Sequence, residues 1–239
     1  MLQNRSKTPS QTYFKHTVYG LRFLLKTEGL PYEYLSLPEI KKDKRVIVVL
    51  SKQEVWAMLQ GCSLLKHRLL IGVLYGCGLS CMEVRALRLK DLDLDRLQLR
   101  VKDGKGKKDR YVPMSVHLAR GLRTYLSVQK PKEFVFESVL HGQPSPDFDG
   151  RYSQRGVQWA VKQAAKRVGI KKDVSVHTLR HTYATHLLED GLDLLSLQHL
   201  LGHCNIQTTL EYLHVAQIET RVSKSPLDSL FAGFTKPKT

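Results

Sequence analysis

The chain has 239 residues, of which 42% are hydrophobic and 25% are charged, a balance typical of globular proteins. No apolar run approaches the ~20 residues that a membrane-spanning helix needs, and the first residues lack the apolar stretch of a secretory signal. We therefore expect a cytoplasmic protein that does not bind membranes. Lys and Arg number 38 against 22 Asp and Glu, which gives a net charge of +16. Such an excess favours a polyanionic partner, and nucleic acid is the first candidate.

The N-terminal segment carries one helix signal. An amphipathic pattern at 12–28 predicts a helix that Gly29 ends. A single helix cannot enclose a hydrophobic core, so residues 1–40 are interpreted as an arm or as the remnant of a larger N-terminal domain. The run KKDKR at 41–45 is interpreted as a charged linker.

Two capping boxes mark helix starts after the linker. Ser51 with Glu54, and Ser80 with Glu83, have the spacing in which a serine caps a helix and a glutamate three residues later bonds back. Between them, residues 64–76 are largely apolar and predict a helix in the centre of the core.

The next elements are a hairpin and a series of helices. Two apolar runs, 97–101 and 111–114, flank the sequence KDGKGKKDR and predict a β-hairpin with a basic tip. Further helices are predicted at 116–128, 154–168, 178–189, 194–201 and 208–213. The expected fold class is therefore α+β, mainly helical, with a small antiparallel sheet.

One stretch gathers residues suited to phosphate chemistry. His177 and Arg180 are three residues apart and share a helical face, while His203 follows the helix-ending Gly202. Arginine binds phosphate oxygens in a bidentate manner, histidine donates hydrogen bonds or moves protons, and a tyrosine hydroxyl such as that of Tyr212 can act as a nucleophile.

Metal binding is the weaker interpretation of the same region. Two HxxxH pairs could supply zinc ligands together with Cys204, namely His177 with His181 and His199 with His203. Both pairs lack the glutamate of HExxH, so we expect no metal site. None of the cysteines forms a CxxC pair, and all are interpreted as reduced, small apolar packing residues: Cys62, Cys77, Cys81 and Cys204.

Four blocks of the sequence resemble the tyrosine recombinases, or phage-type integrases. These blocks occur in the family's order and are YGCGLSCMEVRALRLKDLDL, GKGKKDRYVPM, HTLRHTYATHLLEDG and LLGHCNIQTTLEYLHV. The resemblance implies DNA strand cleavage and rejoining through a 3′-phosphotyrosine, without a metal, ATP or other cofactor. It also implies that Tyr212 is the nucleophile, that Arg180, His177 and His203 bind the phosphate, and that Lys105 protonates the leaving 5′-oxygen, with Lys107 as the fallback.

Ser80 departs from the family's pattern. The family has GLRxxE, whereas this chain has GLSCME, so Ser80 stands where the first catalytic arginine is expected. Serine cannot supply a guanidinium, although it makes a good helix cap with Glu83. Losing one such donor costs roughly 10²–10³ in rate, so we expect weakened catalysis.

The resemblance also divides the chain into segments. Residues 1–40 correspond to the end of a core-binding, SAM-like helical domain, 41–45 to a linker, 46–216 to the catalytic domain, and 217–239 to a tail that docks on a neighbouring protomer. The implied partners are double-stranded DNA and further copies of the chain, as a tetramer on paired sites.

A basic surface is expected to contact the DNA phosphates. Its predicted members are Lys105, Lys107, Lys108, Arg110, Lys162, Lys166 and Arg167. The implied biological role is recombination for a mobile element, in the cytoplasm of a bacterial cell and associated with the nucleoid. Two alternatives stay open: a catalytically inactive DNA-binding relative, which Ser80 favours, and a type IB topoisomerase-like enzyme.

Overall fold

The computed structural model describes residues 11–33, 35, 47–102, 109–138 and 149–216. The chain divides into two compact units, 1–46 and 47–239. The first unit contains helix α1 (Gln11–Thr27), as the amphipathic pattern predicted. Within the described residues, no helix is both long and apolar enough to cross a bilayer. The assignment of residues 1–40 to a core-binding domain stays a prediction.

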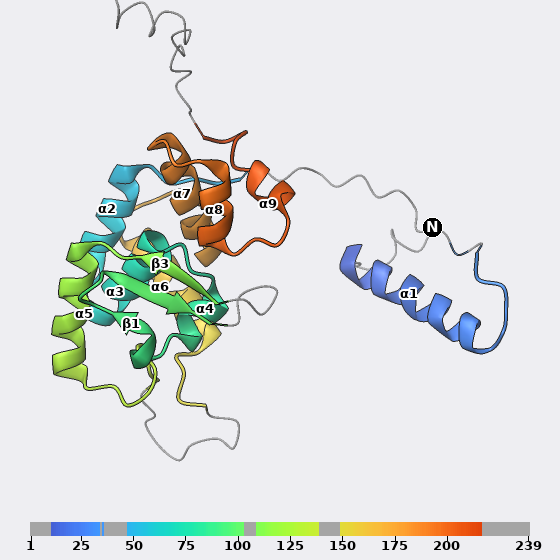
Figure 1. Cartoon of the computed structure of the whole chain (residues 1–239), viewed down its shortest axis with the longest axis horizontal. Helices are drawn as coiled ribbons and strands as arrows, with labels where there is room; N and C mark the ends of the chain where they lie inside the picture. Colours follow the sequence, from blue (N-terminus) through green and yellow to red (C-terminus); the bar gives the residue numbers. More distant parts are fainter. Residues whose placement is uncertain (1–10, 34, 36–46, 103–108, 139–148, 217–239) are drawn as a thin grey trace, which may run out of the picture. The chain divides into compact units, whose positions relative to one another are not determined.

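The second unit is mainly helical and has one small sheet (Figure 1). Its helices are α2 (Lys52–Gly61), α3 (Leu65–Gly76), α4 (Cys81–Ala86), the 3₁₀ helix η2 (Leu89–Asp91), α5 (Val116–Gln129), α6 (Gln154–Arg167), α7 (Val176–Glu189), α8 (Leu194–Leu201) and α9 (Ile206–Leu210). The strands are β1 (Leu92–Asp93), β2 (Gln98–Val101) and β3 (Arg110–Pro113), paired antiparallel in the order β1-β2-β3. The predicted fold class and hairpin are confirmed.

Helix α3 forms the centre of the main core, as its apolar sequence predicted. Its buried side chains are Leu69, Leu70, Ile71, Val73 and Leu74, and the helix contacts α2, α4, α5, α6 and α7. A fully buried Leu or Ile contributes about 1.5–3 kcal/mol, so α3 supplies much of the stability of this unit.

A second, smaller apolar cluster lies where α7, α8 and α9 gather at one end of the unit (Figure 1). Its members are Tyr183, Ala184, Leu188, Leu197, Leu201 and Tyr212. Because Tyr212 belongs to this cluster, the packing of α7 against α8 determines where its hydroxyl lies.

Local hydrogen bonds explain where the helices begin. Both predicted capping boxes form, at Ser51 and at Ser80. Helix α7 begins two residues earlier than predicted because Ser175 caps it, with Thr178 instead of a glutamate as the reciprocal partner. Helix α9 also begins two residues earlier, because the Asn205 side chain accepts a hydrogen bond from the next turn.

The cysteines fit the packing interpretation with one exception. Three are buried, namely Cys62, Cys77 and Cys81, whereas Cys204 is exposed. The prediction that Cys204 packs in the core is therefore wrong, because it lies past the end of α8, where the chain turns toward the surface.

Candidate active site

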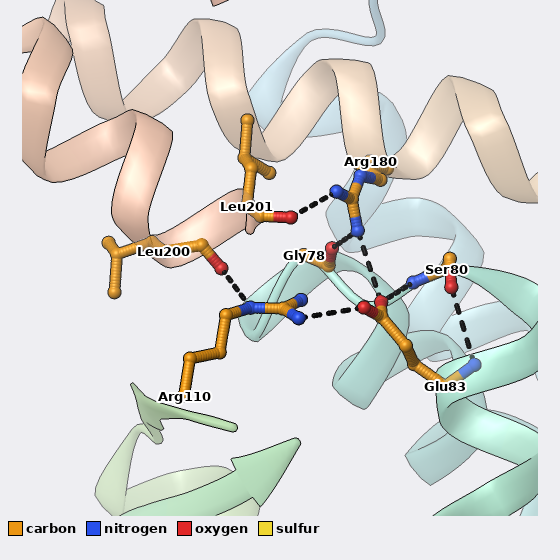
Figure 2. A network of polar contacts seen from close by, with 7 residues as sticks. All are labelled: Gly78, Ser80, Glu83, Arg110, Arg180, Leu200 and Leu201. Carbon is orange, nitrogen blue, oxygen red and sulfur yellow. Dashed lines mark hydrogen bonds and ion pairs between the residues drawn. The ribbon is translucent and has the colours of Figure 1, made fainter. Parts of the chain in front are cut away.

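Arg180 lies on α7 with its guanidinium bound by three acceptors from other elements (Figure 2). Its Nη1 donates to the carbonyl oxygen of Gly78 at 3.0 Å and to Oε2 of Glu83 at 3.1 Å, and its Nη2 donates to the carbonyl oxygen of Leu201. The side chain is only 12% exposed. These contacts hold the charge in one position, as a preorganised phosphate ligand requires.

Ser80 belongs to the same network through its backbone. Its N–H donates to Oε2 of Glu83 at 2.7 Å, and its Oγ accepts a hydrogen bond from the Glu83 N–H at 3.3 Å. One carboxylate oxygen therefore serves both residue 80 and Arg180. A side chain at position 80 begins beside the carboxylate that binds Arg180, and serine adds no guanidinium there.

Glu83 is held as an anion. Burial alone would raise its pKa, but hydrogen bonding and the positive charge of Arg110, the Ser80 N–H and the charge of Arg180 outweigh it. The pKa of this carboxyl therefore lies below its ordinary value, so Glu83 is charged at neutral pH and pairs with both arginines.

Tyr212 follows α9 and is 3% exposed. Its Oη lies 3.1 Å from Nδ1 of His181, and its ring stacks on His203, with ring centroids 6.3 Å apart and an interplanar angle of 11°. Burial raises the pKa of Tyr212, which the nearby charge of Arg180 partly opposes. The hydroxyl is thus protonated at neutral pH, and it would need an acceptor for its proton to act as a nucleophile.

His181 is placed to accept that proton. Burial lowers its pKa, and the neighbouring His177 and Arg180 lower it further, so the ring is neutral at pH 7. A neutral imidazole within hydrogen-bond distance of a hydroxyl has the geometry of a general base.

The two remaining predicted histidines border this pair. His203 follows Gly202, whose φ of +66° ends α8 in the left-handed region, and its Nδ1 lies 2.9 Å from Oγ1 of Thr209. His177 is exposed on α7, with its ring centroid 6.3 Å from that of His181. The structure thus brings together four residues that the sequence predicted to share a site: His177, Arg180, His203 and Tyr212. It adds His181, which lies among them.

The predicted DNA-binding residues fall into three groups. Lys105, Lys107 and Lys108 at the hairpin tip lie outside the described residues. Three others are exposed on α6, namely Lys162, Lys166 and Arg167, of which Arg167 also donates from Nη1 to the carbonyl oxygen of Gly61 at 3.1 Å. Their contact with DNA stays a prediction.

Arg110 requires a correction. Its position after the basic tip predicts a surface cation, yet Arg110 is 4% exposed. Its Nη1 donates to Oε1 of Glu83 at 2.8 Å and its Nε donates to the carbonyl oxygen of Leu200 at 2.7 Å. The alternation of β3 points this side chain inward, so it has no surface to offer a DNA phosphate.

Sequence reasoning missed two roles at this site. Glu83 was interpreted only as a capping partner, and no local pattern shows that its carboxylate also binds two arginines. His181 was considered only as a weak zinc ligand, although its place next to Arg180 put it near the site. Among the described residues there is no group of three or more His, Cys, Asp or Glu side chains that could hold a metal ion.

Comparisons with known proteins identify the family of the chain. The model of the phage integrase family matches residues 48–219, so the chain belongs to that family. A tyrosine recombinase of Thermosipho africanus is 38% identical over 79% of this chain and 64% of its own length, and XerA of Thermococcus kodakarensis is 36% identical over 83% of this chain and 69% of its own. The chain therefore spans about two thirds of the length of these relatives.

Solved structures show the same fold. The crystal structure of XerA recombinase aligns with a TM-score of 0.61 at 25% identity, over 96% of this chain and 78% of that one. XerH recombinase bound to its difH substrate after cleavage aligns with a TM-score of 0.70 at 18% identity, over 95% of this chain and 68% of that one. These alignments show the fold, and the family is shown by the match over residues 48–219.

Proposed function

We propose that the chain is a site-specific DNA recombinase that cuts and rejoins double-stranded DNA through a 3′-phosphotyrosine at Tyr212. The proposal rests on one observation: the hydroxyl of Tyr212 lies in one site with Arg180, His181 and His203. Family membership and the net charge of +16 support DNA as the substrate.

The proposed cleavage is a transesterification. The Tyr212 oxygen attacks the phosphorus, a new O–P bond forms, and the bond to the 5′-oxygen breaks. The tyrosine proton passes to Nδ1 of His181, 3.1 Å away, and the leaving 5′-oxygen takes a proton from Lys105. Tyr212 is buried, so it must move outward to reach a phosphate on DNA.

Charge on the pentacovalent phosphate would be met by Arg180, His177 and His203. These groups are preorganised donors, each worth about 10²–10³ in rate when removed from comparable sites. Rejoining is the reverse attack by a 5′-hydroxyl. The phosphotyrosine conserves the ester bond energy, so rejoining consumes no ATP.

The proposed assembly is a tetramer on two synapsed sites. In it, the tail 217–239 of one protomer docks on the next, and the reaction serves a mobile element in the bacterial nucleoid. Strand exchange between two duplexes needs four active tyrosines, which one protomer cannot supply.

Trapping on a suicide substrate tests the proposal. A duplex nicked near the cleavage position loses a short 5′-hydroxyl fragment after attack, so the covalent protein–DNA product accumulates. We expect a denaturation-resistant adduct that maps to Tyr212, and none from Tyr212→Phe at unchanged DNA affinity. Tyr125→Phe is the control, because Tyr125 on α5 is equally buried, at 3% exposure.

Three results would overturn it. DNA binding without any wild-type adduct would identify a DNA-binding relative that is catalytically inactive. Relaxation of supercoiled plasmid without partner sites or strand exchange would identify a topoisomerase. An adduct on another tyrosine would show that the nucleophile is misassigned.

A further inference from the structure

Arg110 is a buried cation to which the family resemblance assigns no catalytic role. It is the first residue of β3 and directly follows the hairpin tip. A buried charge is retained only when it is paired and hydrogen-bonded, and this one bonds Oε1 of Glu83 and the carbonyl oxygen of Leu200. Its Nη2 is buried and has no hydrogen-bond partner among the described residues. Burying this guanidinium with one nitrogen unbonded costs free energy, which indicates a role for Arg110 beyond the stability of the sheet.

Glu83 lies between Arg110 and Arg180, and each arginine binds a different carboxylate oxygen (Figure 2). The same two guanidinium groups also bind consecutive carbonyls at the end of α8, Arg110 that of Leu200 and Arg180 that of Leu201. Arg110 thus contacts Glu83 and the end of α8, which provide two of the three acceptors that hold Arg180.

The end of α8 also determines where His203 lies. Gly202 follows Leu201 in the left-handed conformation, and a Cβ on Gly202 would lie 2.9 Å from Nη1 of Arg110. The guanidinium therefore packs directly against the turn that leads to His203. Loss of Arg110 would free this turn and the Leu200 carbonyl at the same time.

The charges of the network point in the same direction. One carboxylate and two guanidiniums leave a net positive charge, whereas Glu83 and Arg180 alone would be neutral. Because Ser80 supplies no guanidinium, the second cation of this network comes from Arg110. Because Glu83 pairs with both arginines, it neutralises the charge of Arg180 less completely, and the network retains positive charge that can bind a phosphate.

We propose that Arg110 is a positioning residue for strand cleavage, which rests on the function proposed above. It acts through Glu83 and the end of α8, and holds Arg180 and His203 in the geometry that binds the scissile phosphate. It does not itself touch the DNA.

The test compares Arg110→Met and Arg110→Lys with Arg100→Met. Methionine keeps the apolar length without the charge, and lysine keeps the charge without the two-sided donor geometry. Arg100 is the control, because it lies on the neighbouring strand β2 and its guanidinium bonds the buried Asp91, at 3.0 Å, instead of Glu83. Thermal melting confirms that each variant is folded before it is assayed.

Single-turnover cleavage on saturating suicide substrate is the first readout. We expect Arg110→Met to slow it by about 10²-fold, the effect of a misplaced catalytic group, with DNA affinity within about twofold. Arg110→Lys should lie between Met and wild type, and Arg100→Met should cleave at close to the wild-type rate. If Arg110→Met is unfolded at the assay temperature, the cleavage rate of Arg110→Lys is compared with that of wild type instead.

A methylphosphonate at the scissile position separates positioning from general stability. It replaces a charged non-bridging oxygen by a methyl group. The cleavage rate on this substrate should therefore depend less on the position of the Arg180 guanidinium. The penalty of Arg110→Met should shrink by about tenfold on this substrate. An equal penalty on both substrates, or wild-type cleavage of the phosphodiester by a folded Arg110→Met, would overturn the proposal.

The Nε–H signal of Arg180 in a ¹⁵N NMR spectrum gives a readout that needs no activity. We assign it by its loss in Arg180→Lys. It should shift in Arg110→Met and stay in place in Arg100→Met, and an unmoved signal in Arg110→Met would refute the positioning role. If wild type forms no adduct, the function proposed above fails, while this signal still decides whether Arg110 positions Arg180.

Discussion

Ser80→Arg should restore the guanidinium that the family pattern places at this position. The Ser80 N–H bonds the Glu83 oxygen that also binds Arg180, so a side chain at position 80 starts near Arg180, the proposed phosphate ligand. A preorganised charged donor is worth about 2.7–4 kcal/mol of transition-state stabilisation. We therefore expect cleavage to become about 10²-fold faster, and at least tenfold faster if the new side chain is only partly ordered.

The opposing effects are smaller. The substitution removes the Ser80 Oγ cap of α4, whose hydrogen bond to the Glu83 N–H is long at 3.3 Å, so the loss is about 0.5–1 kcal/mol of stability. The backbone half of the capping box, at 2.7 Å, does not depend on the side chain and is kept. A typical domain has ~5–15 kcal/mol of stability, so the variant should still fold.

The assay is single-turnover cleavage of the nicked substrate by wild type, Ser80→Arg, Ser80→Ala and Ser80→Lys. Alanine removes the cap without adding a donor, and lysine adds a charge without the two-pronged guanidinium. The expected order of rates is Arg, then Lys, then wild type and Ala together. An arginine variant that is folded and no faster than Ser80→Ala would refute the reasoning, and would show that another group already meets this charge.

Three further predictions concern DNA affinity, assembly and pH. Log affinity for DNA should fall with log salt at a slope of about −0.9 per phosphate neutralised, and Lys162→Gln with Lys166→Gln should flatten it; a slope below about two in magnitude would contradict a phosphate-dominated surface. Deleting 225–239, which lies outside the described residues, should preserve single-site binding but reduce synapsis and cleavage together, and unchanged synapsis would show that the tail does not dock on a neighbour. Cleavage should slow as pH falls through the lowered pKa of His181, because a protonated ring cannot accept the tyrosine proton. This loss of rate at low pH should be absent from the residual activity of His181→Asn. It should persist in the control His117→Asn, which changes an exposed histidine on α5.

The same histidine should affect stability in a defined direction. Its pKa in the folded protein lies below the ordinary value of 6.5, so the unfolded chain binds a proton first as the pH falls. Its contribution to folding is thus complete above about pH 6.5 and declines below it.

The sequence by itself determined the features whose partners lie at fixed short spacing. The capping boxes at Ser51 and Ser80 and the apolar helix that became α3 depend on residues three or four positions apart. The hairpin pairs β2 with β3, the next strand along the chain. The spacing of His177 and Arg180 and the LGH and tyrosine blocks likewise indicated the chemistry of the site and its family. The capping boxes and the apolar helix could be predicted because local backbone geometry alone brings their groups together, whereas the site blocks were recognised from their residue order.

Only the tertiary structure decided which groups hold the catalytic side chains. Arg180 takes its acceptors from Gly78 and Glu83, about a hundred residues earlier, and Arg110 reaches a carbonyl 90 residues later. The inward direction of Arg110 depends on packing β3 against α8, and the pairing of Tyr212 with His181 depends on packing α7 against α8 and α9. Such contacts join segments that are distant along the chain, so no local spacing encodes them; burial and the pairing of buried charge select them once the helices pack.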